Sequence, residues 1–187
     1  MRRWQQHPGE HRRRRRRKKG DPDEPADHGL GRSRGGYGSK IHLICDAKGV
    51  PIDVRVTGGQ TQECTQLPEL LMDAAETLSD SGGPPRAWPV RLAGDRGYRS
   101  NKIDRFLRDQ EIRPVIPDMR HQVPGRRAVA FDACWYKRRN IVERVFGWLK
   151  RCRRVGTRYE KTLLNFIAVI KLAIIRRLLG VRLPAKK

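Results

Sequence analysis

The segment of residues 135–154, WYKRRNIVERVFGWLKRCRR, is rich in Lys and Arg and contains a single acidic residue, Glu143. One interpretation of this carboxylate is an ion-pair partner for Arg139 or Arg144, which stabilises a helix only slightly. The other is a metal ligand, because an ionised carboxylate on a basic surface repels a polyanion unless a divalent cation lies between them. Mg²⁺ is usually bound through one or two carboxylates, with waters and substrate phosphates completing its shell.

Asp95 is the natural second carboxylate for such a metal site. It follows the apolar segment 88–94, WPVRLAG, which is expected to form a short strand. In open α/β sheets, ligands gather at the carboxyl ends of strands. An Asx turn or a helix cap before Asn101 is the structural alternative for this residue. Two carboxylates that share two Mg²⁺ ions would favour in-line attack on a phosphodiester.

A helix over residues 130–154 would place Glu143 in an ordered row of side chains. At about 100° per residue, one narrow stripe of this helix contains Tyr136, Arg139, Glu143 and Lys150. Most of the apolar residues lie on the opposite side: Trp135, Ile141, Val142, Val145, Trp148 and Leu149. The helix is therefore predicted to pack one face on a core and to present the polar stripe on the other.

The rest of the pattern predicts a mixed α/β sheet covered by helices. The expected elements are, in order, a hairpin (40–46 and 51–57), a helix (61–79), a strand (88–94), a helix (101–110), a strand (112–118) and two helices (130–154 and 162–179). The apolar segment 161–181 is interrupted by Lys171 and closed by Arg176 and Arg177. We therefore expect a buried core helix there rather than a membrane span.

The chain has 187 residues, which suits one domain, and carries 42 Lys and Arg against 20 Asp and Glu, a net charge of +22. A field of this sign attracts polyanions and points first to nucleic acid. Residues 1–39 are basic or rich in Pro and Gly and predict a disordered tail before a domain at 40–180, with a basic C-terminal tail at 181–187. The four cysteines show no CxxC pairing, so free thiols are expected rather than a zinc site.

These motifs together resemble the catalytic part of the DDE transposases of bacterial insertion sequences. The polar stripe fits the signature Tyr-x2-Arg-x3-Glu-x6-Lys of that group, as Tyr136, Arg139, Glu143 and Lys150. The segment AGDRGY is similar to the family's block around its second catalytic Asp, here Asp95. Residues 31–63 resemble the block that precedes it, and residues 157–173 resemble the helix that closes the domain.

The resemblance implies an α/β, ribonuclease-H-like fold, with a mixed sheet flanked by helices. It also implies a reaction in which Mg²⁺ or Mn²⁺, expected as a two-ion site, assists hydrolysis at the ends of a mobile element, and the freed 3′-OH then attacks target DNA. Asp95 and Glu143 would be catalytic metal ligands. Arg139 and Lys150 would contact DNA phosphates, and Tyr136 would help to position the DNA end.

The family uses three carboxylates, and the first Asp, which belongs to the first strand, has no counterpart in this sequence. The aspartates before Lys40 are Asp21, Asp23 and Asp27, which lie in a segment broken by Pro and without a β pattern. The fold is therefore expected to lack its first strand. The sequence is interpreted as a truncated or split-frame copy, with little or no transposition by this chain alone.

The resemblance implies double-stranded DNA as the partner, both the element ends and the target, and a cytoplasmic, nucleoid-associated bacterial protein without a membrane segment. Two assemblies remain open, a homodimer and an association with an upstream-frame product. The competing class is a nonenzymatic basic nucleic-acid-binding protein. Such a protein would use the same basic surface and would need neither Asp95 nor Glu143.

Overall fold

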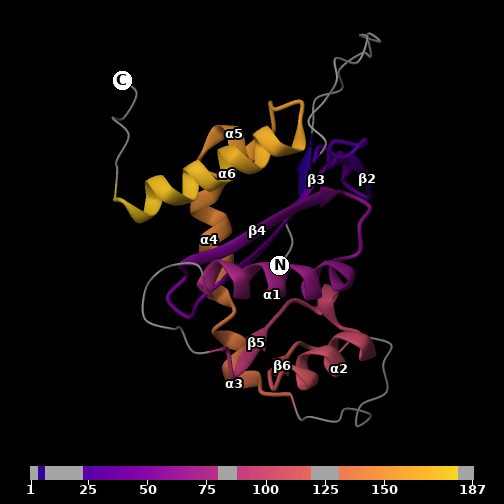
Figure 1. Ribbon diagram of the computed structural model, residues 1–187, viewed down its shortest axis with the longest axis vertical. Coiled ribbons are helices and arrows are strands. Elements are labelled where there is room, and N and C mark those ends of the chain that lie inside the picture. The colour runs from indigo at the N-terminus through magenta and orange to yellow at the C-terminus, as the bar shows by residue number, and fades with distance from the viewer. Residues whose placement is uncertain (1–3, 7–22, 80–87, 119–130, 181–187) are drawn as a thin grey trace.

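The computed structural model describes residues 4–6, 23–79, 88–118 and 131–180 (Figure 1). Within these ranges the strands are β1 (Trp4–Gln6), β2 (Gly31–Ser33), β3 (Gly36–Cys45), β4 (Pro51–Gly58), β5 (Arg91–Ala93) and β6 (Arg113–Val115). The helices are α1 (Glu63–Ser79), α2 (Asn101–Asp109), α3 (Ala133–Lys137), α4 (Asn140–Leu149), α5 (Arg153–Gly156) and α6 (Leu163–Leu178), with a 3₁₀ turn η1 (Arg96–Tyr98). This mixed order of strands and helices confirms the predicted α/β class.

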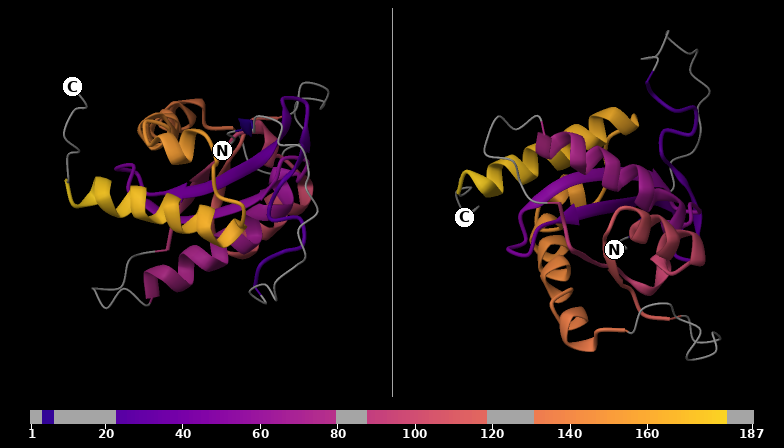
Figure 2. Two further views of the ribbon diagram at one scale, coloured as in Figure 1. Left: turned by 90° about the horizontal axis from the view of Figure 1, so that it is seen from above. Right: turned by 60° about the horizontal axis from the view of Figure 1, so that its bottom comes forward.

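The hairpin of β3 and β4 forms the centre of the molecule, as its alternating sequence predicts. The two strands pair antiparallel over residues 39–45 and 51–58. Since successive side chains of a strand point to opposite faces, the hairpin contributes to two cores. Ile41 and Leu43 pack against the C-terminal helices, whereas Ile44 packs on the other side with residues of α1. Accordingly, α1 and α4 lie on opposite sides of the hairpin (Figure 2).

The first core lies between the hairpin and the C-terminal helices. Its buried members are Ile41, Leu43, Val54, Val56, Val142, Val145, Phe146, Leu149, Val155, Phe166 and Ile170. Burial of a side chain of this size stabilises a fold by about 1.5–3 kcal/mol relative to exposure. The core therefore fixes the rotation of α4, with its apolar face inward and Glu143 on the exposed side, as the helical stripe predicts.

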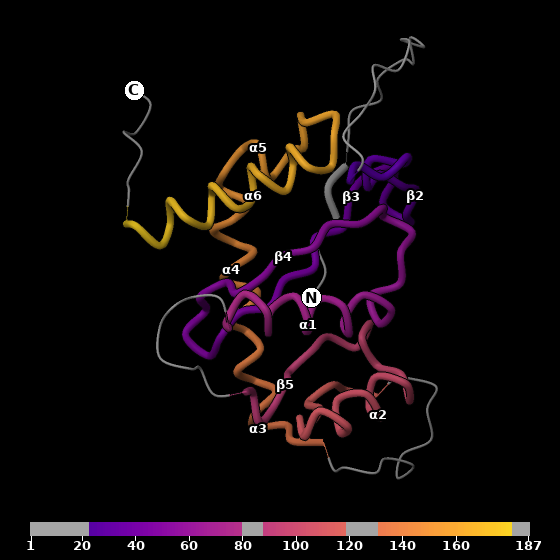
Figure 3. The backbone as a smooth tube through the Cα atoms, viewed as in Figure 1, coloured from indigo at the N-terminus to yellow at the C-terminus, as the bar shows by residue number. Residues whose placement is uncertain are grey.

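A second core joins α1 to the region of β5, β6 and α2 (Figure 3). It contains Leu67, Leu71, Tyr98, Ile103, Leu107, Ile112 and Ile116. β5 and β6 form a separate two-stranded parallel sheet, in which Leu92 lies opposite Pro114. The α2 helix begins after Ser100, whose hydroxyl accepts a hydrogen bond from the N–H of Ile103 at 3.1 Å. This core holds the carboxyl end of β5 in place, and with it Asp95.

Residues 23–39, which the sequence predicts as part of a disordered tail, include groups that contact the C-terminal part of the chain. Glu24 accepts hydrogen bonds from the backbone N–H groups of Leu163 and Leu164 and so caps the first turn of α6. Arg158, which is 1% exposed, donates to the backbone oxygen of His28 at 2.8 Å. Polar composition predicted disorder because the segment buries little apolar surface, but these distant partners satisfy its polar groups.

Two other segments of the predicted tails are not described by the structure. The basic run at residues 12–19 and the C-terminal tail at residues 181–187 lie outside the described residues. The strand β1 pairs antiparallel with residues 38–40 of β3.

The single helix predicted over residues 130–154 consists of three shorter helices. Between α3 and α4, the N–H groups of Arg139 and Val142 donate to the carbonyls three residues earlier, so the helix tightens there into 3₁₀-type bonding. After α4, Cys152 adopts an extended backbone, with φ −73° and ψ 107°. Cys152 thus separates α4 from α5, and Val155 of α5 lies in the first core. Neither break is marked by Pro or Gly, the residues that ordinarily signal one.

The α6 helix packs with one face only, which corrects the expectation of a buried core helix. Phe166 and Ile170 are completely buried, whereas Leu172 and Leu178 are more than half exposed. The C-terminal half of α6 extends past the hairpin, and no helix or strand among the described residues covers its outer face (Figure 1). Across the described part of the chain, the structure contains no helix with the length and apolar character needed to cross a membrane.

Candidate active site

Asp95 lies immediately after β5 and caps the 3₁₀ turn η1. Its Oδ1 accepts a hydrogen bond from the N–H of Arg96 at 2.7 Å, and its carbonyl accepts one from the N–H of Tyr98 at 2.9 Å. Asp95 therefore caps η1, whereas the helix that begins at Asn101 is capped by Ser100. The cap occupies Oδ1 of a half-buried side chain, and Oδ2 takes no part in that bond.

Glu143 lies on the outer face of α4 and forms the ion pair considered for it. Its Oε1 accepts a hydrogen bond from Nη1 of Arg139 at 2.8 Å, and its side chain is 52% exposed. An exposed pair at this helical spacing stabilises a protein by only about 0.3–0.5 kcal/mol. The pair therefore holds Glu143 weakly, and a competing cation could take its place.

Arg139 interacts with both carboxylates, through a hydrogen bond to Glu143 and through the charge of Asp95. Besides its bond to Glu143, its guanidinium lies 5.2 Å from the centre of the Tyr136 ring. Burial opposes the charge on Arg139, but the hydrogen bond to Glu143 and the negative charge of Asp95 outweigh burial and raise the pKa of Arg139 above its usual value. Its Nε is buried and has no hydrogen-bond partner within the described residues.

Two aromatic side chains, Phe131 and Tyr136, lie near Asp95. The rings of Phe131 and Tyr136 lie 5.3 Å apart at an interplanar angle of 57°. Asp95 and Tyr136 line one shallow hollow of about 490 Å³, together with Arg96, Pro117 and Phe131. The structure thus brings the end of β5 next to α3, which the sequence could not place relative to each other. Phe131 and Arg96 were not among the predicted site residues.

Lys150 lies at the end of α4, where its backbone N–H donates to the carbonyl of Phe146 at 3.0 Å. Its side chain is half-buried. The residue follows Glu143 by two helical turns, so it remains on the same side of α4 as predicted. Tyr136, on α3, completes the row across the 3₁₀-type joint between the two helices.

A cluster of Arg side chains around Trp135 was not predicted as part of the site. The guanidinium of Arg91 lies 4.8 Å from the centre of the Trp135 ring, and that of Arg138 lies 4.6 Å from it. Such contacts orient the cations by the ring quadrupole. The sequence signal was present in Trp135 and Arg138, which are separated by one helical turn, but Arg91 comes from a different element. The site is therefore more cationic than the polar stripe alone indicates.

The donor chemistry of the two carboxylates fits a hard divalent cation in part. Within the described residues, no group of three His, Cys, Asp or Glu side chains is placed to hold a metal ion. Mg²⁺ and Mn²⁺ accept carboxylate oxygens, and Mg²⁺ commonly completes its shell with waters and phosphate oxygens. Asp95 and Glu143 can contribute such oxygens. The site needs further oxygen ligands from a nucleic acid or from a third carboxylate.

Comparison with known proteins assigns the sequence to a family. A family model described as a transposase DDE domain matches residues 5–178. The chain is 36% identical over 124 residues to a protein of Burkholderia cepacia named as a transposase for insertion sequence element IS402, a match that covers 66% of this chain and 54% of that protein. The chain thus spans about half the length of that relative. It is 28% identical over 138 residues to a protein of Brucella ovis named as a transposase for element IS6501, covering 72% of this chain and 93% of that protein.

No solved structure matches the chain. The family assignment therefore rests on the sequence comparisons, which agree with the resemblance seen in the polar stripe and in the segment around Asp95. Because the family model covers all the elements that carry Asp95, Tyr136, Arg139, Glu143 and Lys150, the chain belongs to the transposase DDE domain family.

Proposed function

We propose that this chain carries two of the metal-binding carboxylates of a transposase, which cleaves the ends of an insertion sequence and transfers them to target DNA. One observation supports the proposal above the others. Asp95 and Glu143, which come from different elements, both act on the guanidinium of Arg139. Two carboxylates at one cation, on a chain with a net charge of +22, suit a reaction at a phosphodiester.

Each residue of the site has a role in this proposal. Bound Mg²⁺ or Mn²⁺, as a two-ion site, would supply Lewis-acid activation of the phosphate. Asp95 and Glu143 would contribute oxygen ligands, and Arg139, with its raised pKa, remains charged and contacts a DNA phosphate. Lys150 contacts a second phosphate, and Tyr136, backed by the ring of Phe131, positions the DNA end.

We also propose that the fold is ribonuclease-H-like, with a first strand and a third carboxylate that come from outside the described residues. The order of hairpin, α1, β5, α2, β6 and C-terminal helices supports this proposal. The partners are double-stranded DNA and a polypeptide that contributes the strand, such as an upstream-frame product, with a homodimer as the alternative assembly. The protein would act at the nucleoid in a bacterial cytoplasm.

A nonenzymatic nucleic-acid-binding protein is the second candidate. Two observations favour it, since Asp95 caps η1 and Glu143 pairs with Arg139, so neither carboxylate needs a metal to explain its presence. The two candidates agree on DNA binding. They differ in whether these carboxylates bind a divalent cation.

The experiment that separates them is a calorimetric titration of Mn²⁺ into the purified chain with a short DNA duplex, paired with an assay of supercoiled plasmid nicking. Three variants are compared: Glu143→Gln, Asp95→Asn and Glu69→Gln. Asn remains a good capping residue, so Asp95→Asn should preserve η1 while it removes the charge. Glu69, on the exposed side of α1 and paired with Arg55, provides a matched control carboxylate.

The transposase proposal predicts that Glu143→Gln and Asp95→Asn each weaken Mn²⁺ binding by about tenfold, which corresponds to about 1.4 kcal/mol. Slow nicking by the unmodified chain should disappear in both variants and persist in Glu69→Gln. Strand transfer by the chain alone should be little or none, because the described residues place no third carboxylate at the site. Mn²⁺ binding that is equal in all the proteins would overturn the proposal and favour the nonenzymatic candidate.

A further inference from the structure

Three arginines from β5, β6 and α3 lie close together beside Trp135. The guanidinium of Arg91, the first residue of β5, lies 4.8 Å from the centre of the Trp135 ring, and that of Arg138, at the end of α3, lies 4.6 Å from it. Arg113, the first residue of β6, is the partner of Arg91 in the register of this parallel pair. Register partners in a parallel sheet project to the same face, so Arg91 and Arg113 are neighbours. These three residues form what we call the arginine cluster.

Among the residues that the structure describes, no Asp or Glu forms a salt bridge with the arginine cluster. Other arginines of the fold do form salt bridges with Asp or Glu: Arg55, Arg99, Arg139 and Arg154. The buried Nε of Arg113 also has no hydrogen-bond partner within the described part of the chain. Like charges on neighbouring strands repel, and each contact with an aromatic ring offsets only about 0.5–2 kcal/mol. The cluster therefore has a positive charge that an anion would neutralise.

Arg138 leaves α3 on a different side from its neighbour Arg139. The two residues contact different rings, those of Trp135 and Tyr136 respectively. Successive residues of a helix are about 100° apart, so the two guanidiniums point in different directions. The arginine cluster is therefore set apart from Glu143, the carboxylate to which Arg139 bonds.

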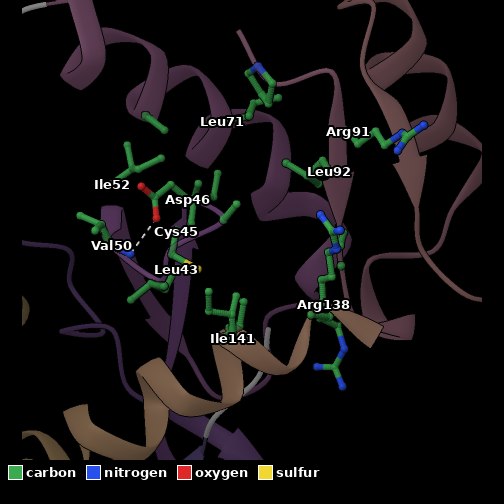
Figure 4. Close-up of a pocket in the computed structure, with 18 of the residues that line it drawn as sticks. Leu43, Cys45, Asp46, Val50, Ile52, Leu71, Arg91, Leu92, Arg138 and Ile141 are labelled. Carbon is green, nitrogen blue, oxygen red and sulfur yellow. Dashed lines mark hydrogen bonds between the residues drawn. The ribbon is translucent and has the colours of Figure 1, made fainter. Parts of the chain in front are cut away.

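The surroundings of the cluster are also separate from the hollow that Asp95 lines. Arg91 and Arg138 line one side of a cavity of about 990 Å³, and Asp46 and Val50 line the other side (Figure 4). Among the described residues, this cavity shares no lining residue with the hollow that contains Asp95. An anion bound by the arginine cluster would therefore lie outside the pair of carboxylates that is proposed to bind metal.

Neighbouring guanidiniums are suited to one kind of anion. Arginine offers parallel N–H donors that match the oxygens of a phosphate, and it keeps its charge at every physiological pH. We propose that the arginine cluster is a second phosphate site, which binds one backbone phosphate of the DNA duplex away from the reacting phosphodiester. The inference rests on the proposed function, which supplies DNA as the ligand. Contacts on two sides of α3 would fix the orientation of the duplex relative to Asp95, because a contact on one side alone leaves it free to turn.

The test measures the binding of a short DNA duplex to the full chain at several salt concentrations, with EDTA to remove divalent metal. The variants are Arg91→Gln, Arg138→Gln and the double variant that combines them. Arg105→Gln is the matched control, because Arg105 is exposed on α2 and lies outside the arginine cluster. Circular dichroism and urea unfolding establish that each variant is folded.

Each single variant should weaken duplex binding by about tenfold at low salt, which corresponds to about 1.4 kcal/mol. Because both arginines bind the same phosphate, the double variant should lower the salt dependence by about one counterion rather than two. Its loss of affinity should also be smaller than the product of the single losses, as for residues that share a partner. Arg105→Gln should weaken binding by less than about twofold, because salt screens a charge that does not contact the duplex.

Arg91→Lys separates the geometry of the guanidinium from its charge. Lysine keeps the charge but lacks the paired donors, so this variant should keep the salt dependence of the unmodified chain while it binds about threefold more weakly. An affinity equal to that of the unmodified chain would contradict the proposal, because the paired donors of Arg91 would then play no part in binding.

Gln variants of the cluster that bind the duplex as Arg105→Gln does would overturn the proposal. A double variant that loses two counterions would also overturn it, because the arginines would then contact separate phosphates. A further arm titrates inorganic phosphate into the chain and follows tryptophan fluorescence. Saturable phosphate binding that Arg91→Gln abolishes, together with unchanged duplex affinity, would identify a site for free phosphate and overturn the assignment to DNA. No divalent metal is present in either arm, so a failure here leaves the metal-binding proposal to its own test.

Discussion

Arg139 bonds to Glu143, the same carboxylate that a metal ion at this site would bind. Its guanidinium bonds to Glu143 and lies in the field of Asp95, so the protein itself offsets part of the charge of the two carboxylates. A divalent cation that binds Glu143 must therefore displace or rearrange this ion pair. The row of Tyr136, Arg139, Glu143 and Lys150 thus contains an internal competition between a side-chain cation and a metal cation.

This competition gives a prediction at the scale of the residue. Arg139→Gln should raise the affinity of the site for Mn²⁺ about twofold, because the exposed ion pair is worth only about 0.3–0.5 kcal/mol. The same change should weaken binding to a DNA duplex, because it removes a phosphate contact and lowers the salt dependence of binding by about one counterion. Calorimetry with Mn²⁺ and a DNA-binding titration at several salt concentrations measure the two effects.

Arg138→Gln is the matched control, because Arg138 neighbours Arg139 and contacts Trp135 rather than Glu143. It should leave the Mn²⁺ affinity unchanged. If both Gln variants shift Mn²⁺ binding equally, the effect comes from net charge and the specific competition at Glu143 is absent.

At the scale of the element, the first turn of α6 is capped by a residue from near the other end of the sequence. Thr162 caps the helix locally, but the carboxylate of Glu24 accepts the N–H groups of Leu163 and Leu164. A negative charge at this position also complements the helix dipole. Burial acts against the charge of Glu24, yet these hydrogen bonds and that of His28 lower its pKa.

Glu24→Ala should therefore destabilise the chain by about 1 kcal/mol, the usual loss for a helix cap. Glu24→Gln keeps one acceptor oxygen but not the charge, so it should lose less. Urea unfolding at neutral pH, followed by circular dichroism, measures both values. Stabilities that are indistinguishable among the three proteins would show that Thr162 caps α6 alone.

Element boundaries divide into those that local sequence determines and those that it does not. The β3–β4 hairpin, α1 and α2 could be predicted, because alternation, helical spacing and the Ser100 cap are properties of neighbouring residues. The folding of residues 23–39 could not, since Glu24 depends on Leu163, its partner 139 residues away. The break at Cys152 likewise accompanies the burial of Val155, which depends on tertiary packing and not on neighbouring residues.

The candidate site divides in the same way. The stripe on α3 and α4 follows from helical periodicity, and the exposure of Glu143 confirms its direction. The approach of Asp95 to Arg139 required the packing of β5 against these helices, which no local pattern encodes. The contact of Arg91 with Trp135 depends on the same packing and was missed for the same reason.

At the scale of the whole molecule, His42 links the hairpin to the second core. It is completely buried on β3, with Nε2 2.9 Å from Oγ1 of Thr57 and Nδ1 3.3 Å from the hydroxyl of Tyr98. Burial, together with the charges of Lys40 and Arg55, lowers the pKa of His42 to about 3. The folded protein therefore holds this ring in its neutral form throughout the physiological range.

Stability should consequently fall in acid. Between about pH 6.5, where an unfolded histidine titrates, and the folded value of about 3, the unfolded chain binds a proton that the folded chain excludes. Stability from His42 is therefore present above this window and is lost as pH falls through it, by at most about 1.4 kcal/mol per pH unit. Urea unfolding at pH 7 and pH 5 measures the loss.

His42→Gln keeps polar atoms near Thr57 and Tyr98 but cannot titrate. Its stability should change less between the two pH values than that of the unmodified chain, because the unfolded variant no longer gains a proton at position 42. An equal change in both proteins would mean that His42 takes no part in the acid response.

The cap from Glu24 and the buried contacts of Arg158 also have a consequence for the order of events on the ribosome. The segment that contains Glu24 and His28 is synthesised early, but its partners Arg158 and Leu163 emerge only after most of the chain has been translated. At about 5–20 residues per second, the delay is on the order of ten seconds. During synthesis this segment therefore lacks its contacts with Arg158 and Leu163. A nascent chain that stalls before Arg158 leaves the segment accessible to chaperones and proteases.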